Sequence, residues 1–238
     1  MIGILLPPMV PGALLNAGIS MAGRVPVNLN YTSSQEALDS AIARCDLKTI
    51  ITSQKLLDRF SIPKRPGMVM LEDLAKEIPS ALKIPYAAAA LLLPGFVLRR
   101  WLVPRSVKLD SLATIIFSSG STGDPKGVML SHHNIYSNLD GMAQVFAISR
   151  QDRILGVLPF FHSFGFTGTL WFPLAKGMGA IYHPNPLDAR TIGAMAGRYH
   201  ATILLATPTF LQSYTRRCNP EDFGSLQFVM VGAEKLTD

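Results

Sequence analysis

The sequence predicts an α/β fold of largely parallel sheets flanked by helices, and three observations support this fold class. The chain has 238 residues, a length that suits one large domain or two small ones. Hydrophobic residues make up 48% and charged residues 16%, which supplies a substantial core and argues against disorder. Short β-branched runs alternate with helix-like segments, a pattern typical of parallel sheets covered by helices.

The first residues are apolar but do not resemble a secretory signal peptide. No basic residue precedes the apolar run, and Pro7, Pro8 and Pro11 interrupt it. Further on, Ser33 and Ser34 favour a helix start. We therefore expect strands at Ile2–Leu6, Val25–Asn28, Thr49–Thr52 and Val69–Leu71, and helices at Pro11–Met21, Ala37–Cys45 and Gln54–Phe60.

Residues 78–110 interrupt the alternation. Prolines punctuate an apolar stretch, Ala87–Leu98, which Arg99, Arg100 and Trp101 follow. This stretch is too short to span a bilayer as a helix. Two interpretations stay open: a buried core segment, or a surface segment that dips into a membrane with the arginines at the headgroups.

The alternation resumes after residue 110, with no internal repeat and no low-complexity linker. Expected strands are Leu112–Phe117, Arg153–Leu158, Ala180–Tyr182, Thr202–Ala206 and Phe228–Val231. Expected helices are Asn134–Phe146, Asp188–Tyr199 and Thr209–Thr215.

Charge and cysteines bound the function only loosely. The net charge of +6 favours anionic ligands, nucleotides or an acidic membrane surface. No long Lys/Arg run is present, so no nucleic-acid partner is expected. Cys45 and Cys218 lie far apart without a metal-like or CxxC pattern, which indicates a reducing compartment and two core thiols.

The most informative segment is Phe117–Val128, which reads FSSGSTGDPKGV. Glycines let backbone amides turn toward a ligand, and the serines and threonine add hydroxyl donors. Lys126 adds a compact positive charge suited to phosphate oxygens. The ordinary P-loop requires Ser or Thr after the lysine, whereas Gly127 follows it in this chain. The pattern favours a loop that wraps around a polyphosphate over a Gly/Ser-rich turn without function.

This segment resembles the phosphate-binding signature of the adenylate-forming (AMP-binding) superfamily of acyl-CoA synthetases, luciferases and peptide-synthetase adenylation domains. Two further segments match in order. Leu158–Phe166, LPFFHSFGF, resembles the segment that lines the acyl pocket, and Val231–Leu236, VGAEKL, resembles the segment beside adenine. The segments LLPP and PVNLNYT add to this resemblance. Taken together, the segments are most similar to the acyl–acyl-carrier-protein synthetase half of a bacterial bifunctional 2-acylglycerophosphoethanolamine acyltransferase.

The resemblance implies roles for individual residues, with ATP and Mg²⁺ as cofactors. No magnesium ligand can be assigned from the sequence. Lys126 and His162 would be catalytic, and His162, Ser163 and Phe164 would face the acyl substrate. The ATP-binding residues would be Ser118, Ser119, Gly120, Ser121, Thr122, Gly123, Lys126, Gly232, Ala233 and Glu234.

The implied activity is that of a ligase that forms a carbon–sulfur bond. ATP would activate a fatty acid as an acyl-adenylate, and the acyl group would pass to a pantetheine thiol of acyl carrier protein or coenzyme A. Adenylation brings two anions together, the carboxylate and the α-phosphate. The site must offset their repulsion with directed hydrogen-bond donors, and a metal ion would add positive charge. The implied location is cytoplasmic, at the inner face of the cell membrane, with peripheral contact through residues 87–101.

The resemblance also implies a domain organisation. Residues 1–238 would form part of the amino-terminal AMP-binding domain, with an apolar insert at residues 85–104. The rest of that domain and the small lid domain would be absent, and this fragment would be inactive alone. Two alternatives remain. One is a fatty acyl-CoA ligase of the same superfamily, and the other is a truncated, non-catalytic nucleotide- or acyl-binding module. A Rossmann-like dehydrogenase is disfavoured because no G-x-G-x-x-G follows a strand.

Three histidines have alternative interpretations. His162 lies between aromatic residues, so a packed core position competes with a substrate-facing one. His132 and His133 resemble the capping region of a helix more than a metal pair, because adjacent residues do not share one helix face.

Overall fold

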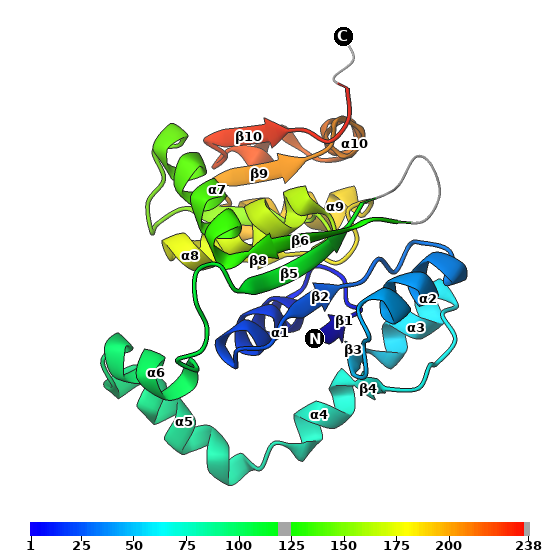
Figure 1. The fold of residues 1–238 in the computed structure, drawn as a ribbon. Coiled ribbons are helices and arrows are strands. Elements are labelled where there is room, and N and C mark those ends of the chain that lie inside the picture. The colour runs from blue at the N-terminus through cyan, green and yellow to red at the C-terminus, as the bar shows by residue number, and fades with distance from the viewer. Residues whose placement is uncertain (119–124, 236–238) are drawn as a thin grey trace. The chain divides into compact units, whose positions relative to one another are not determined.

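The computed structural model describes residues 1–118 and 125–235, and the chain divides into two units (Figure 1). The first unit consists of Met1–Leu6 and Leu14–His133, and the second of Pro7–Ala13 and Asn134–Asp238. Each unit contains a four-stranded parallel sheet, so the predicted α/β class is confirmed.

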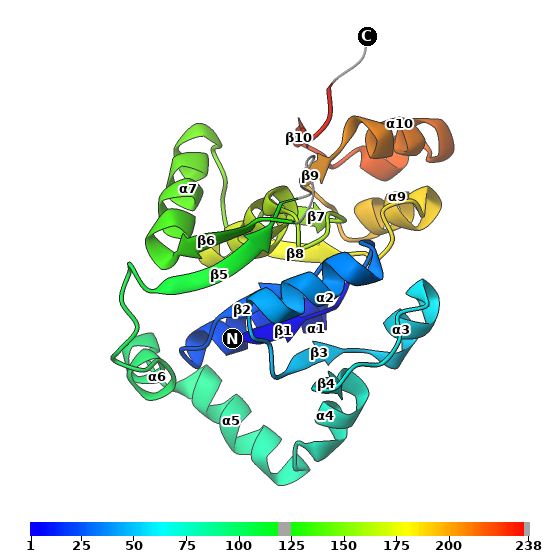
Figure 2. The same cartoon turned by 45° about the vertical axis from the view of Figure 1, so that its right-hand side comes forward.

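The sheet of the first unit has the strand order β2-β1-β3-β4 (Figure 2). Its strands are β1 (Ile2–Ile4), β2 (Pro26–Asn28), β3 (Ile50–Thr52) and β4 (Met68–Met70). The connecting helices are α1 (Val10–Met21), α2 (Gln35–Arg44) and α3 (Gln54–Phe60). Every strand and helix expected up to Phe60 is present, with ends that differ by a few residues at most.

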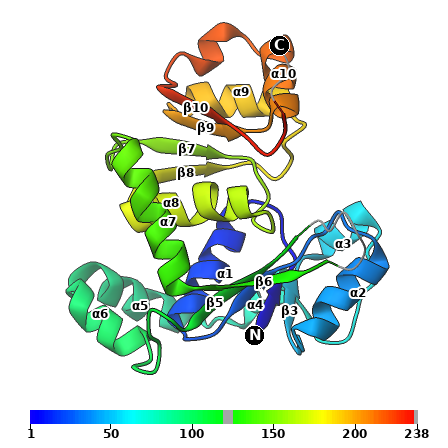
Figure 3. The ribbon, with the colours of Figure 1, turned by 45° about the horizontal axis from the view of Figure 1, so that its top comes forward.

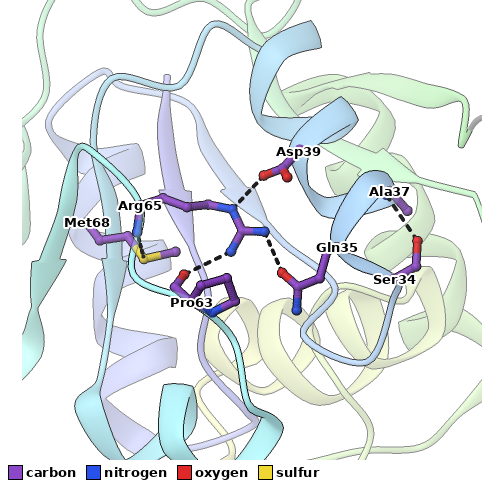
Figure 4. Close-up of polar contacts among 7 residues, drawn as sticks. All are labelled: Ser34, Gln35, Ala37, Asp39, Pro63, Arg65 and Met68. Atoms are coloured by element: carbon purple, nitrogen blue, oxygen red, sulfur yellow. Dashed lines mark hydrogen bonds and ion pairs between the residues drawn. The ribbon is translucent and has the colours of Figure 1, made fainter.

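Helix starts and turns in this unit follow from local polar side chains. The Ser34 hydroxyl accepts a hydrogen bond from the Ala37 amide at 3.2 Å and begins α2, as the sequence indicates. Arg65, ahead of β4, donates to the side chains of Asp39 and Gln35 on α2 (Figure 4). These bonds tie the turn before β4 to α2.

A buried pair of amide side chains joins α1 to β2. Asn16 and Asn28 donate to each other, at 3.0 and 2.8 Å, and both are almost fully buried. Each amide supplies one donor and one acceptor to the other, so these polar atoms do not remain unsatisfied in the core.

Residues 71–102 form three helices: α4 (Leu71–Glu77), α5 (Ser80–Leu92) and α6 (Gly95–Leu102). The expected strand Val69–Leu71 begins and ends one residue earlier, because Leu71 starts α4. Every residue of α5 and α6 is described, and none is buried. The buried-core interpretation of this stretch is therefore wrong. No described helix is long and apolar enough to cross a membrane.

The segment that resembles a phosphate-binding signature begins at the end of one strand, β5 (Leu112–Phe117), and ends in the next, β6 (Gly127–Ser131). β5 pairs antiparallel with β6, a strand that the sequence analysis did not identify. The Thr114 hydroxyl donates to the Pro26 carbonyl at 2.8 Å, which fixes the hairpin to β2. The two strands of this hairpin depart from the otherwise parallel arrangement.

The sheet of the second unit has the order β10-β9-β7-β8 and lies between two helical layers (Figure 3). Leu155 and Leu204 face α9 and α10, whereas Ile154 and Ile203 face α7 and α8. The strands are β7 (Arg153–Gly156), β8 (Gly179–Tyr182), β9 (Ile203–Ala206) and β10 (Phe228–Val231). The helices are α7 (His132–Val145), α8 (Phe172–Lys176), α9 (Ala189–Arg198) and α10 (Pro208–Arg217), with the π-helix η1 (Gly165–Trp171) and the 3₁₀ helix η2 (Pro220–Phe223).

The two cysteines are free thiols. Cys45 is buried, as expected of a core thiol, whereas Cys218 is only half-buried and lies 3.0 Å from the Ala189 carbonyl.

Candidate functional site

The hairpin between β5 and β6 brings the two ends of the phosphate-like loop together. The Ser118 amide donates to the Lys126 carbonyl at 2.9 Å, and the Lys126 side chain is exposed. Gly127, the next residue, packs closely against Ile115 of β5, since a Cβ at position 127 would lie 3.0 Å from the Ile115 side chain. The predicted ligands Ser119, Gly120, Ser121, Thr122 and Gly123 lie outside the described residues.

The acyl-pocket segment changes from buried to exposed at His162. Phe160 and Phe161 are buried, His162 and Ser163 are exposed, and Phe164 is half-buried. Since His162 lies at the surface, the core interpretation of this residue is wrong.

The local fold of this segment depends on a glycine. A Cβ on Gly165 would overlap the Pro159 carbonyl oxygen and would lie 2.9 Å from that of Leu158. The Phe166 amide donates to the His162 carbonyl at 2.8 Å, so the chain turns directly into η1. Gly165 thus lets the backbone pack against itself immediately beside His162.

The imidazole of His162 lies beside an aromatic ring, and its surroundings favour the neutral form. Its ring lies against that of Phe161, with the ring centres 4.5 Å apart. Partial burial disfavours the charged form and lowers the pKa of His162 below its usual value. A neutral imidazole donates one hydrogen bond and accepts another.

The adenine-like segment turns sharply after β10. The Gly232 amide donates to the Ala206 carbonyl at 3.2 Å. Ala233 has a φ of +67°, in the left-handed backbone region that residues other than glycine rarely adopt. Such conformations persist only where the surroundings impose them, and they concentrate at functional sites.

Glu234 is held at the start of α10. Its carboxylate accepts from the Thr209 hydroxyl at 2.7 Å and from the Thr209 amide at 3.3 Å. These hydrogen bonds lower the pKa of Glu234, so the carboxylate is ionised at neutral pH. The sequence pattern did not single out Thr209 as a partner of Glu234, although polar residues follow the buried strand β9 and could have pointed to it.

Phe164 joins the acyl and adenine segments. Its ring lies 3.5 Å from the position of a Cβ on Gly232. The segments follow β7 and β10, and Thr209 follows β9, so all three lie at the carboxyl edge of one parallel sheet. In open α/β sheets, ligands bind at this edge.

An apolar cavity of about 140 Å³ lies in the same unit. Its walls come from α7, the start of α8, β9 and β10. Phe164 packs against the apolar cluster to which several wall residues belong. The lining residues are Met142, Phe146, Ile148, Phe172, Ile203, Leu205, Phe228, Val229 and Met230.

Metal ligands remain unassigned. Across residues 1–118 and 125–235, no group of three or more His, Cys, Asp and Glu side chains could hold an ion. His132 and His133 begin α7, and their amides donate to the carbonyls of Ser111 and Leu109. The two histidines therefore occupy the helix start that the sequence indicates.

Within the second unit, the structure brings the sequence-predicted acyl and adenine segments together. Phe164 contacts the Gly232 turn within the second unit, and the Ser118–Lys126 loop belongs to the first unit.

Known proteins support this architecture. p-Hydroxybenzoic acid–AMP ligase FadD22 from Mycobacterium marinum is 26% identical over 53% of this chain and 18% of its own length. Indigoidine synthase from Streptomyces lavendulae is 28% identical over 94% of this chain and 16% of its own. O-Succinylbenzoate coenzyme A synthetase (MenE) from Bacillus subtilis, in complex with AMP, superposes with a TM-score of 0.77 at 21% identity.

The superposition covers 98% of this chain and 54% of the Bacillus enzyme, which was also solved in complex with ATP and magnesium ion. The chain thus spans about half of that enzyme and less than a fifth of the two relatives. The family model described as AMP-binding enzyme matches residues 1–238. Because this match extends over the whole sequence, the chain belongs to the AMP-binding enzyme family.

Proposed function

We propose that the protein uses ATP to activate a fatty acid as an acyl-adenylate and transfers the acyl group to a pantetheine thiol. One observation carries the proposal: the acyl and adenine segments meet at a sheet edge, in a unit that also contains an apolar cavity. Membership of the AMP-binding family supports the adenylation step.

In the first step, an oxygen of the fatty-acid carboxylate attacks the α-phosphorus of ATP, and pyrophosphate leaves with its bonding electrons. Lys126 and the amides of the Ser118–Lys126 loop would offset charge on the β- and γ-phosphates. A magnesium ion bound to ATP would supply further positive charge beside these phosphates. Neutral His162 would donate a hydrogen bond to an oxygen of the reacting carboxylate.

The turn after β10 would position the nucleotide. Gly232 leaves room beside the Phe164 ring, and the left-handed backbone at Ala233 directs the following peptide groups. Thr209 holds Glu234, so this turn is ordered before a ligand binds. In the second step, a pantetheine thiolate attacks the acyl carbonyl and AMP leaves, forming the carbon–sulfur bond.

The cavity lining favours a fatty acid over other carboxylates. Its walls are aliphatic, aromatic and thioether side chains, which offer no partner for a phenol or an ammonium group. The acceptor is acyl carrier protein or coenzyme A. The acyl carrier protein is the acceptor that the sequence resemblance favours, together with a role beside a phospholipid acyltransferase.

Pyrophosphate exchange on the intact protein tests the proposal. Exchange should depend on medium- or long-chain fatty acids and should be weak with p-hydroxybenzoate and with amino acids. Exchange with the aromatic or amino acid alone would reject the fatty-acid assignment. Nucleotide binding without exchange for any acid would favour a non-catalytic binding module.

A cavity-filling variant tests the pocket directly. Met142→Trp should shift the preferred acid toward shorter chains, because the larger ring occupies the cavity between α7 and β10. Val145→Trp is the matched control, since Val145 lies on the same helix and is 76% exposed. An equal change of preference in both variants would mean that the cavity does not hold the acyl chain.

A further inference from the structure

Most of the net positive charge of the protein comes from one segment. Residues 78–109, called the α5–α6 segment below, contain five basic residues and no acidic ones. The other residues contain 17 basic and 16 acidic side chains, so this segment accounts for five of the six net positive charges. The basic residues are Lys83, Arg99, Arg100, Arg105 and Lys108.

The same segment exposes large apolar side chains. Leu91 is 85% exposed, Leu92 80%, Ile84 77% and Phe96 73%. Isolated apolar side chains are common at protein surfaces, whereas a contiguous group marks an interaction site. The rings of Tyr86 and Trp101 stack with centres 5.8 Å apart, which holds α5 and α6 side by side (Figures 1 and 3). The exposed leucines therefore belong to a folded pair of helices.

Arginines and apolar groups share one hollow at α6. None of the three arginines that line this hollow, Arg99, Arg100 and Arg105, forms an ion pair with a carboxylate among residues 1–118 and 125–235. Their guanidinium groups are planar donors that suit phosphate oxygens. The residues lining this hollow include Phe96, Arg99, Arg100, Val103, Arg105 and Val107.

The carboxyl end of the segment is fixed to the turn between α1 and β2. Gly23 has a φ of +68°, and a Cβ there would lie 2.9 Å from the Pro104 side chain. The arginine-lined hollow therefore has a defined attachment to the first unit.

We propose that the α5–α6 segment docks the protein on the surface of an anionic lipid bilayer. Headgroup phosphates would pair with the arginines, and the leucines and Phe96 would enter the boundary of the acyl chains. Tyrosine and tryptophan, which have an apolar body and a polar tip, suit the level of the headgroups. Residues 87–93 are consecutive apolar residues, so the second half of α5 lacks the polar rim that borders a protein interface.

This inference is independent of the proposed function, because it depends only on the charge and exposure of one segment. A bilayer surface carries many anionic headgroups, so basic residues spread along the segment can pair with it without a matching protein partner. The cytoplasmic leaflet carries anionic lipids, so it is the bilayer surface that this proposal assigns to the protein.

Vesicle flotation with the intact protein tests the inference. The protein should float with vesicles in which about a third of the lipids are anionic, and much less with zwitterionic vesicles. The double variant R99Q/R100Q should weaken binding about 30-fold, since each arginine near the surface contributes roughly 1 kcal/mol. R216Q/R217Q is the matched control: it removes two adjacent, exposed arginines from α10 and should bind normally.

The apolar part has its own variant and a local reporter. Leu91→Ser with Leu92→Ser should weaken vesicle binding without unfolding the protein, because both side chains are exposed. The chain has two tryptophans, so Trp101→Phe should remove any blue shift of fluorescence on vesicle binding, leaving Trp171 as background.

Equal binding by R99Q/R100Q and R216Q/R217Q would overturn the inference. Failure of the native protein to bind anionic vesicles would also overturn it. If these same variants then disrupted self-association or binding to an acidic protein, the surface would be a protein interface instead.

Discussion

Replacing Gly165 with alanine perturbs the candidate site without changing any group that contacts substrate. Gly165 begins η1 and lies three residues after His162. The added methyl group would overlap the Pro159 carbonyl oxygen and crowd that of Leu158. Both oxygens belong to backbone, which cannot move aside as the end of a flexible side chain can.

The structure sets the size of the effect. The Pro159 carbonyl must retreat by about 1 Å to reach an ordinary C···O separation of about 3.3 Å. Overpacking of this kind costs roughly 1–3 kcal/mol of unfolding free energy. Alanine recovers about 0.5–1 kcal/mol by restricting the unfolded chain, so the net result is destabilising. A shift of about 1 Å at Pro159–His162 should lower the rate of adenylation by up to about 10²-fold.

Urea unfolding and fatty-acid-dependent pyrophosphate exchange measure the two effects on the intact protein. Gly141→Ala is the control, because Gly141 lies in α7 and nothing is within 4 Å of an added Cβ. This control should stabilise the protein by about 0.5–1 kcal/mol and leave exchange unchanged. The reasoning fails if Gly165→Ala matches the native protein in both stability and exchange.

Three further predictions address other residues. Lys126→Ala should slow pyrophosphate exchange by roughly 10²-fold with little change in unfolding free energy, because the side chain is exposed; an equal loss of stability would make its role structural. Partial burial lowers the pKa of His162, so pyrophosphate exchange should fall only at a pH below the usual pKa of histidine, where the neutral imidazole is lost; this acid limb of the pH profile should disappear in His162→Gln, and an unchanged limb would assign it to another group. Asn28→Ala deprives Asn16 of two buried hydrogen bonds and should lower the unfolding free energy by about 1–3 kcal/mol in urea; an unaltered midpoint would contradict this.

Part of the site could be predicted from the sequence because it depends on local patterns. The Ser/Thr/Gly run ending at Lys126 is one continuous stretch, and so is the aromatic segment around His162. Each could therefore be recognised without knowledge of the fold. The bond from Thr209 to Glu234 joins residues 25 positions apart and exists only because β9 and β10 are neighbours. The left-handed Ala233 was also unpredictable, because alanine carries no sign of that conformation.

The sequence by itself determined the alternation of strands and helices, the apolar residues of the parallel strands, and the three segments that resemble the family's signatures. These properties follow from residue spacing and local chemistry, which act over a few positions. Tertiary structure decided the antiparallel pairing of β6, the exposure of the α5–α6 segment and the meeting of Phe164 with Gly232. An apolar helix such as α5 has the same sequence pattern whether or not something covers it. Only the packing of the rest of the chain determines which apolar surfaces are buried.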